Sequence, residues 1–125
     1  GGTEEAYYAS AIEVSMDEWG VSSADAATYL ALPEVAYATA AGDWKQKIGS
    51  QKWIAMFNNG YEGWTAWRLL DLGLEGPVVD GVTLDIPTRF LYPTSEATLN
   101  GSQYDSAASA IGGDTKTTKI FWDVN

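Results

Sequence analysis

The chain lacks cysteine and histidine entirely over its 125 residues. Without cysteine, the chain can form no disulfide framework and offers no thiol nucleophile. Without histidine, it offers no imidazole base and no Cys/His zinc site. Long apolar runs are also missing, since no stretch approaches the roughly 20 apolar residues that a membrane helix requires. Carboxylates are therefore the remaining candidates for catalytic groups.

Basic residues are scarce. The chain has 7 Lys and Arg against 17 Asp and Glu, which gives a formal net charge of −10. The first basic residue is Lys45, so the first 44 residues contain eight acids and no base. Such a surface repels phosphate backbones, and this argues against nucleic acid as a partner. Solubility is the simplest reason for the acidity.

The composition is otherwise that of a folded protein. Hydrophobic residues make up 46% of the chain and aromatic residues 13%, and the length suits one domain at most. The chain opens with two glycines and no Met, which indicates a cut or engineered end.

The first 72 residues are predicted to be helical. A helix over 3–20 begins at Thr3 as N-cap and ends at Gly20. Its apolar face combines Tyr8, Ile12, Met16 and Trp19, at helical spacing. A second helix is expected over 22–42, broken or kinked near Leu32 because Pro33 follows.

Two more helices are expected over 43–60 and 61–73. Asp43 is the N-cap of the first, and Gly49 could bend its middle. The Asn-Asn-Gly turn at 58–60 separates them, and so short a turn favours antiparallel packing.

Four rings lie at helical spacing around that turn: Trp53, Phe57, Trp64 and Trp67. We interpret them as the buried seam of the helix pair. Trp and Tyr also suit pyranose rings, because each combines a flat apolar face with a hydrogen-bonding atom. Tyr37 and Trp44 belong to no clear stripe, and they are therefore the candidate exposed, ligand-binding rings.

The last 53 residues have a different character. Residues 74–96 predict extended chain or a small hairpin around Asp80-Gly81, with Ile86, Phe90 and Leu91 packed on the helices. A short helix is expected over 102–114 and an extended tail over 118–125. The predicted organisation is a helical-repeat portion over 1–72, with a mostly extended segment over 73–125 packed on it.

Chemical motifs are weak. The acid pairs Asp80/Asp85 and Asp71/Glu75 resemble the carboxylates of a glycosidase, but seventeen acids make such pairs common by chance. The chain has no P-loop and no calcium-loop pattern, so we predict no cofactor and no metal. Arg89, amid apolar extended chain, is interpreted as an anchor for backbone carbonyls, with contact to a substrate as the alternative.

Four motifs in order carry a resemblance: "AYYASAIEVSMDEWGV", "IGSQKWIAMFNNGYEGWTAWRLLDLG", "IPTRFLYPTSEATLN" and "YDSAASAIGGDTKTTKIFWD". The succession resembles the C-terminal part of the SusD/RagB family of surface glycan-binding lipoproteins of Bacteroidetes. The resemblance covers nearly the whole chain. It implies a mainly α fold with tetratricopeptide-like antiparallel helix pairs, and a non-enzymatic role.

The resemblance also implies partners. The family captures oligosaccharides, or in some members peptides, at the outer-membrane surface, and passes them to a SusC-type TonB-dependent transporter. Family members are several times longer, so the remaining N-terminal part, with its lipidated cysteine, is itself an expected partner.

Two other functions stay open from the residues. One is a helical-repeat module that binds a protein only, and the other is a small acidic glycoside hydrolase. If the chain is part of a SusD-like protein, we expect it alone to bind glycans weakly or not at all. We also expect it to self-associate through an exposed apolar end.

Overall fold

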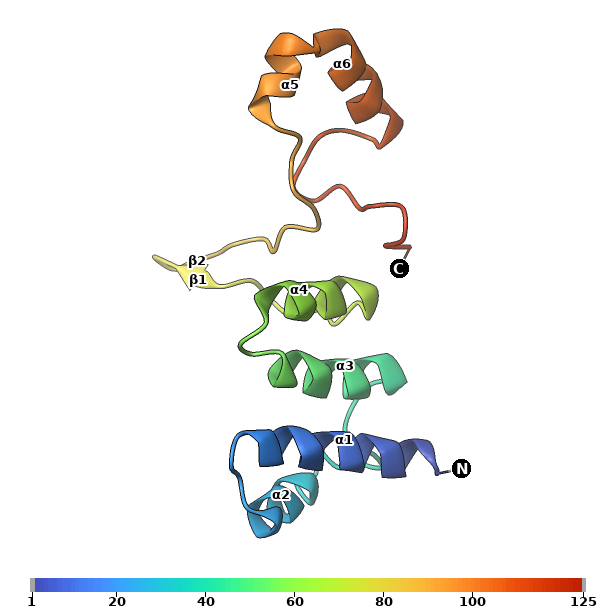
Figure 1. Ribbon diagram of the computed structural model, residues 1–125, viewed down its shortest axis with the longest axis vertical. Helices are drawn as coiled ribbons and strands as arrows, with labels where there is room; N and C mark the ends of the chain where they lie inside the picture. Colours follow the sequence, from blue (N-terminus) through green and yellow to red (C-terminus); the bar gives the residue numbers. More distant parts are fainter. Residues whose placement is uncertain (1, 125) are drawn as a thin grey trace. The chain divides into compact units, whose positions relative to one another are not determined.

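The computed structural model describes residues 2–124 and divides into two compact units, Gly1–Leu72 and Gly73–Asn125. The described residues contain six helices and one two-stranded sheet (Figure 1). The predicted mainly α class is confirmed. Within the described residues, none of the helices combines the length and apolar character that a membrane crossing demands.

Helix α1 (Glu4–Glu18) begins and ends as its sequence predicts. The Thr3 side chain accepts a hydrogen bond from the Ala6 N–H at 3.2 Å, and Gly20 leaves the helix with φ +74°. Tyr8 and Ile12 are buried on the expected face. Trp19 is the exception, because it is 57% exposed and forms the C-cap.

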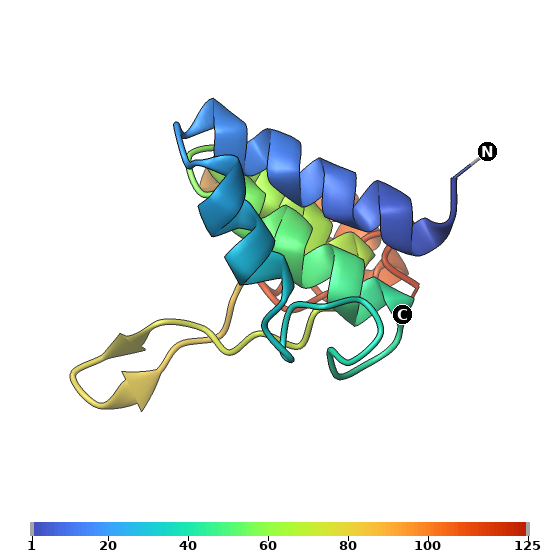
Figure 2. The same ribbon diagram turned by 90° about the horizontal axis from the view of Figure 1, so that it is seen from below.

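The second helix, α2, covers only Ser23–Leu30, so the predicted helix over 22–42 is too long. Residues 31–42 form turns, which Figure 2 shows as a loop between α2 and α3. Pro33 explains the early end, since its ring disfavours helical backbone before it. The loop still completes the core: Val35 is buried, and its carbonyl accepts a 2.6 Å hydrogen bond from the Tyr8 hydroxyl.

Helices α3 (Trp44–Ala55) and α4 (Gly60–Leu69) lie side by side and run in opposite directions (Figure 1). Asp43 and Gln46 form a capping box at the start of α3. The helix continues through Gly49, so it has no break at the predicted bend. The tetratricopeptide-like character of the helix pairs stays a prediction.

Small residues and the edge of one ring line the contact between α3 and α4, since a Cβ atom built at Gly63 would lie 3.9 Å from Trp53 Cδ1. Gly49, Gly63 and Ala66 are buried on these two helices, and this allows their backbones to approach closely. Trp53 is 46% exposed and Phe57 is 83% exposed. The prediction that these two rings form the buried seam is therefore wrong. The other two rings of the predicted seam, at 64 and 67, are half-buried.

The second unit begins with the predicted hairpin. Strands β1 (Val78–Val79) and β2 (Val82–Thr83) are antiparallel, with Val79 opposite Val82. Asp80 and Gly81 connect them with φ of 50° and 78°. Positive φ at both central residues is the signature of the type I′ turn that suits two-residue hairpins.

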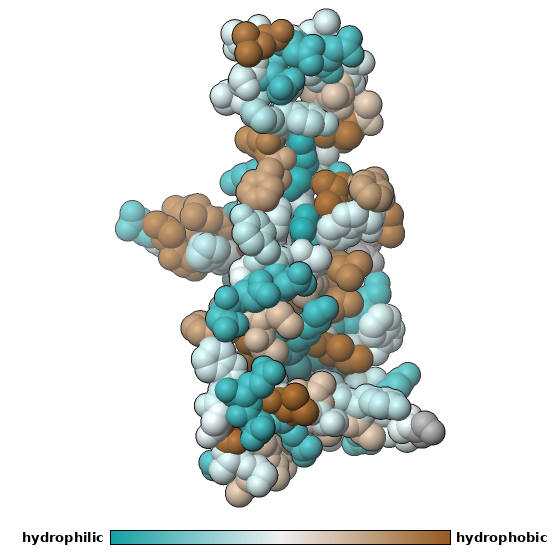
Figure 3. All heavy atoms as spheres, viewed as in Figure 1, coloured by the Kyte–Doolittle hydropathy of each residue, from teal (hydrophilic) through white to brown (hydrophobic). Residues whose placement is uncertain are grey.

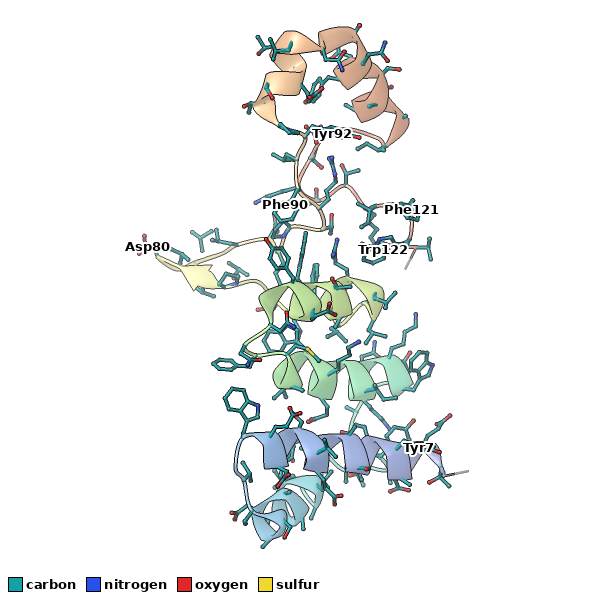
Figure 4. The ribbon with its side chains drawn as sticks, viewed as in Figure 1. Tyr7, Asp80, Phe90, Tyr92, Phe121 and Trp122 are labelled. Carbon is teal, nitrogen blue, oxygen red and sulfur yellow. The ribbon has the colours of Figure 1, made fainter. Side chains whose placement is uncertain are left out.

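The rest of this unit contains two short helices, α5 (Thr94–Leu99) and α6 (Gly101–Ala110). The sequence predicted α6 with a later start, and it did not predict α5. The expectation that Phe90 and Leu91 are packed down is also wrong. Both are exposed, Phe90 by 69%, and Figure 4 shows Phe90 on the chain between the hairpin and α5.

Gly49 provides a test of the close packing between α3 and the residues that directly follow α4. A Cβ atom there would lie 2.2 Å from Leu72 Cδ2 and 3.1 Å from Leu70 Cδ1. The overpacking cost of about 1–3 kcal/mol exceeds the roughly 1 kcal/mol gained from helix propensity. Gly49→Ala should therefore lower the free energy of unfolding by about 1 kcal/mol in urea titrations.

Gly60→Ala is the matched control, because no atom lies within 4 Å of a Cβ built there. This variant should be as stable as the parent chain or slightly more stable. Equal stabilities of the two variants would mean that Gly49 does not sit in a close seam.

Candidate functional site

Trp44, one of the two predicted ligand-binding rings, is the first residue of α3 and is 54% exposed. In the described residues it makes no ring contact with another aromatic side chain. The capping box of Asp43 and Gln46 fixes the backbone beneath it. Trp44 is thus an accessible ring that stands alone.

Tyr37, the other predicted ring, is half-buried in the loop over 31–42. Its ring centroid lies 5.2 Å from that of Tyr8, and the Lys47 ammonium lies 5.2 Å from the Tyr37 centroid. Its hydroxyl donates to Glu4 Oε2 at 3.0 Å, and this bond, with desolvation, raises the pKa of Tyr37. The ring is therefore committed largely to internal contacts.

A second pair of rings meets at the surface of the same unit. Trp19 closes α1 and Phe57 follows α3, and their ring centroids lie 6.3 Å apart with the planes at 68°. We call this pair the aromatic corner. Because both side chains are more than half exposed, the corner presents two differently oriented ring faces to solvent.

Sequence reasoning placed both rings in apolar stripes and so missed the corner. Helical spacing predicts burial only while the helix continues. Trp19 is the C-cap of α1, and Phe57 lies just beyond the end of α3 at Ala55. The signal available in the sequence was that each ring directly precedes a helix-ending sequence. Gly20 follows Trp19, and the Asn-Asn-Gly turn follows Phe57.

The second unit contains a buried ion pair. Arg89 donates to the Asp114 carboxylate, and both side chains are 8% exposed. The Tyr92 backbone N–H and the Tyr104 hydroxyl donate to the same carboxylate at 3.2 and 3.1 Å. The Arg89 guanidinium also stacks on the Tyr92 ring, 4.8 Å from its centroid. The predicted role of Arg89 as an anchor for backbone carbonyls is therefore wrong, because its partner is a carboxylate.

These contacts set the protonation of Asp114. Desolvation works to raise its pKa. The hydrogen bonds from Arg89, Tyr92 and Tyr104, with the charge of Arg89, outweigh desolvation and hold the pKa of Asp114 below its usual value. We call this group of four residues the carboxylate clasp. It joins the chain before α5 to the chain after α6 and is suited to a structural role.

The remaining acids form no recognisable centre. Asp80 lies at the tip of the hairpin (Figure 4), and Asp71 adopts φ 48° just after α4. Within residues 2–124, no group of three or more Asp and Glu side chains is arranged to hold a metal ion.

Comparison with protein families gives a match that covers most of the chain. The SusD-like family, described as starch-binding and associating with the outer membrane, matches residues 1–93. This range includes the whole first unit and the hairpin of the second. Among curated proteins, no match is found.

Solved structures resemble the chain over its full length. A SusD-like protein named for Bacteroidetes AC2a is 30% identical, with a TM-score of 0.84 over 99% of this chain and 26% of its own. A protein named as chitin-binding is 28% identical, with a TM-score of 0.73 over 100% of this chain and 29% of its own. The chain thus spans between a quarter and a third of each of these structures.

The carboxylate clasp predicts acid sensitivity. The pKa of Asp114 is lower in the folded chain than in the unfolded chain. Its ionised form therefore stabilises the fold at pH values above the unfolded pKa, which is about 4. This stabilisation is lost as the pH falls toward the folded pKa. Melting temperatures should therefore drop on acidification below about pH 4. Asp114→Asn should lower the melting temperature at neutral pH. It should also flatten the acid limb, that is, the part of the melting profile below about pH 4.

Asp105→Asn is the control, since it removes one exposed carboxylate from α6 in the same unit. It should leave the acid limb of the melting profile as steep as in the parent chain. An Asp114→Asn profile that runs parallel to the parent profile would show that the clasp does not set the acid sensitivity.

Proposed function

Because the chain belongs to the SusD-like family, described as starch-binding and associating with the outer membrane, we propose that it captures nutrient oligosaccharides at the cell surface. This role is non-enzymatic. The observation that carries the proposal is the family match over residues 1–93. The likeness to a chitin-binding protein over 100% of the chain supports a glycan as the ligand class.

The side chains suit binding better than hydrolysis. Exposed rings offer apolar faces to sugars, whereas glycoside hydrolysis needs two carboxylates facing each other across a substrate. Asp80 is in the turn of an exposed hairpin. Asp114 is held by Arg89 below its usual pKa, so it is unsuited to serve as a general acid near neutral pH.

Further partners follow from the same proposal. The relatives are several times longer than the chain, so the chain would work within a longer protein that carries the lipid anchor and contributes most of the ligand contacts. That protein would deliver oligosaccharides, or peptides, to a SusC-type TonB-dependent transporter.

A protein-binding module is the second candidate, and the hairpin favours it. Four apolar residues of the hairpin region are exposed, namely Val78, Val79, Val82 and Leu84. Figure 3 shows a hydrophobic patch over the hairpin. A two-stranded hairpin is marginally stable in water by itself. A protein surface that covers these side chains would stabilise it.

Affinity electrophoresis tests glycan capture by the chain. Native gels that contain soluble starch or glycol chitin expose the chain to many copies of each neutral sugar, so weak binding becomes visible as slower migration. We expect retardation in at least one of these gels relative to a plain gel, and none for an unrelated acidic protein of similar size. Unchanged mobility in every gel would contradict glycan capture by this chain.

A further inference from the structure

We infer that the aromatic corner is a subsite for a neutral oligosaccharide, with the side-chain amides of Asn58 and Asn59 as its hydrogen-bonding edge. The inference rests on the proposed function. It adds to that function a location on this chain, which the family description leaves open, and a physical reason for the preference for neutral sugars.

The rings are placed as a sugar would require. Trp19 and Phe57 come from different helix ends, yet their centroids lie 6.3 Å apart at 68°. A pyranose ring has apolar C–H faces that can stack on one ring while its edge meets the other. The two helices that carry the rings, α1 and α3, contact each other in the first unit.

The amides next to Phe57 are free to bind. Asn58 and Asn59 are exposed, and within residues 2–124 neither side chain makes a hydrogen bond. Asn59 occupies the N-cap position of α4, yet its side chain makes no capping bond, although Asn is among the preferred capping residues. Each amide offers two donors and one acceptor, which match the adjacent hydroxyls of a sugar.

Local charge selects the class of sugar. Asp17 and Glu18 directly precede Trp19, and no Lys or Arg lies within four residues of either ring along the chain. Carboxylates accept hydrogen bonds from hydroxyl groups, but they repel uronate and sulfate groups. A neutral oligosaccharide is therefore favoured over an anionic one, in keeping with the net charge of −10.

The two rings predicted from the sequence lack this combination. Trp44 has no second ring beside it, and Tyr37 is packed against Tyr8 and Lys47. The corner joins two exposed rings to the amides of Asn58 and Asn59.

The test is a titration of the 125-residue chain, followed by NMR and calorimetry. The neutral probes are maltoheptaose and chitohexaose, and the anionic probe is an oligogalacturonate of similar length. We expect weak binding of at least one neutral probe, with shifts of the Trp19 indole and the 57–60 amides, and binding at least about tenfold weaker for the anionic probe.

Variants locate the site. Trp19→Ala and Phe57→Ala should each weaken binding of the neutral probe by about tenfold, whereas Trp19→Phe should retain most of it. Trp44→Ala removes a ring of nearly equal exposure, 54% against 57%, and should leave the affinity unchanged. Because all these side chains are largely exposed, the melting temperatures should stay close to that of the parent chain.

The outcomes separate this inference from the proposed function. Neutral-sugar binding that survives both alanine variants, or that is lost in Trp44→Ala, would overturn the subsite and leave glycan capture intact. Equal binding of the anionic probe would overturn the charge selection. Absence of binding to all three probes would overturn both the inference and glycan capture by this chain. Dimerisation that depends on Phe57, without any sugar effect, would assign the corner to a protein contact instead.

Discussion

The close packing of α3 against α4 at buried glycine and alanine positions is the constraint on which the rest of the first unit depends. Gly49, Gly63 and Ala66 fill the seam, and a single added methyl group at Gly49 would collide with Leu72. The Trp53 ring borders this seam, because a Cβ atom built at Gly63 would lie 3.9 Å from Trp53 Cδ1, yet the residue stays 46% exposed. The turn after α3 presents Phe57 beside Trp19 at the surface.

Local sequence signals predicted the ends of elements better than their packing. The caps at Thr3 and Asp43 and the hairpin turn at Asp80-Gly81 were predictable, because each depends on the conformation of a few neighbouring residues. The seam was not predictable from spacing, because helical periodicity identifies a face but not what that face packs against.

The same distinction applies to the candidate site and to the second unit. Trp44 was predictable as an exposed ring from its place at a helix start. The corner joins residues 38 positions apart, and the carboxylate clasp joins Arg89 to a residue 25 positions later. Such long-range pairs have no local signal. The apolar sequence around Arg89 gives no indication that its partner is Asp114, the aspartate of the Gly-Gly-Asp motif at 112–114. Only the three-dimensional structure brings the two together.

The central claim is that the first unit leaves the aromatic corner open to solvent. Hydroxyl-radical footprinting of the monomeric chain, read residue by residue by mass spectrometry, tests it most directly. Trp19 and Phe57 should be oxidised as readily as Trp44, whereas buried Tyr8 should be protected. Protection of Trp19 and Phe57 to the level of Tyr8 would place the rings inside the unit and contradict the account.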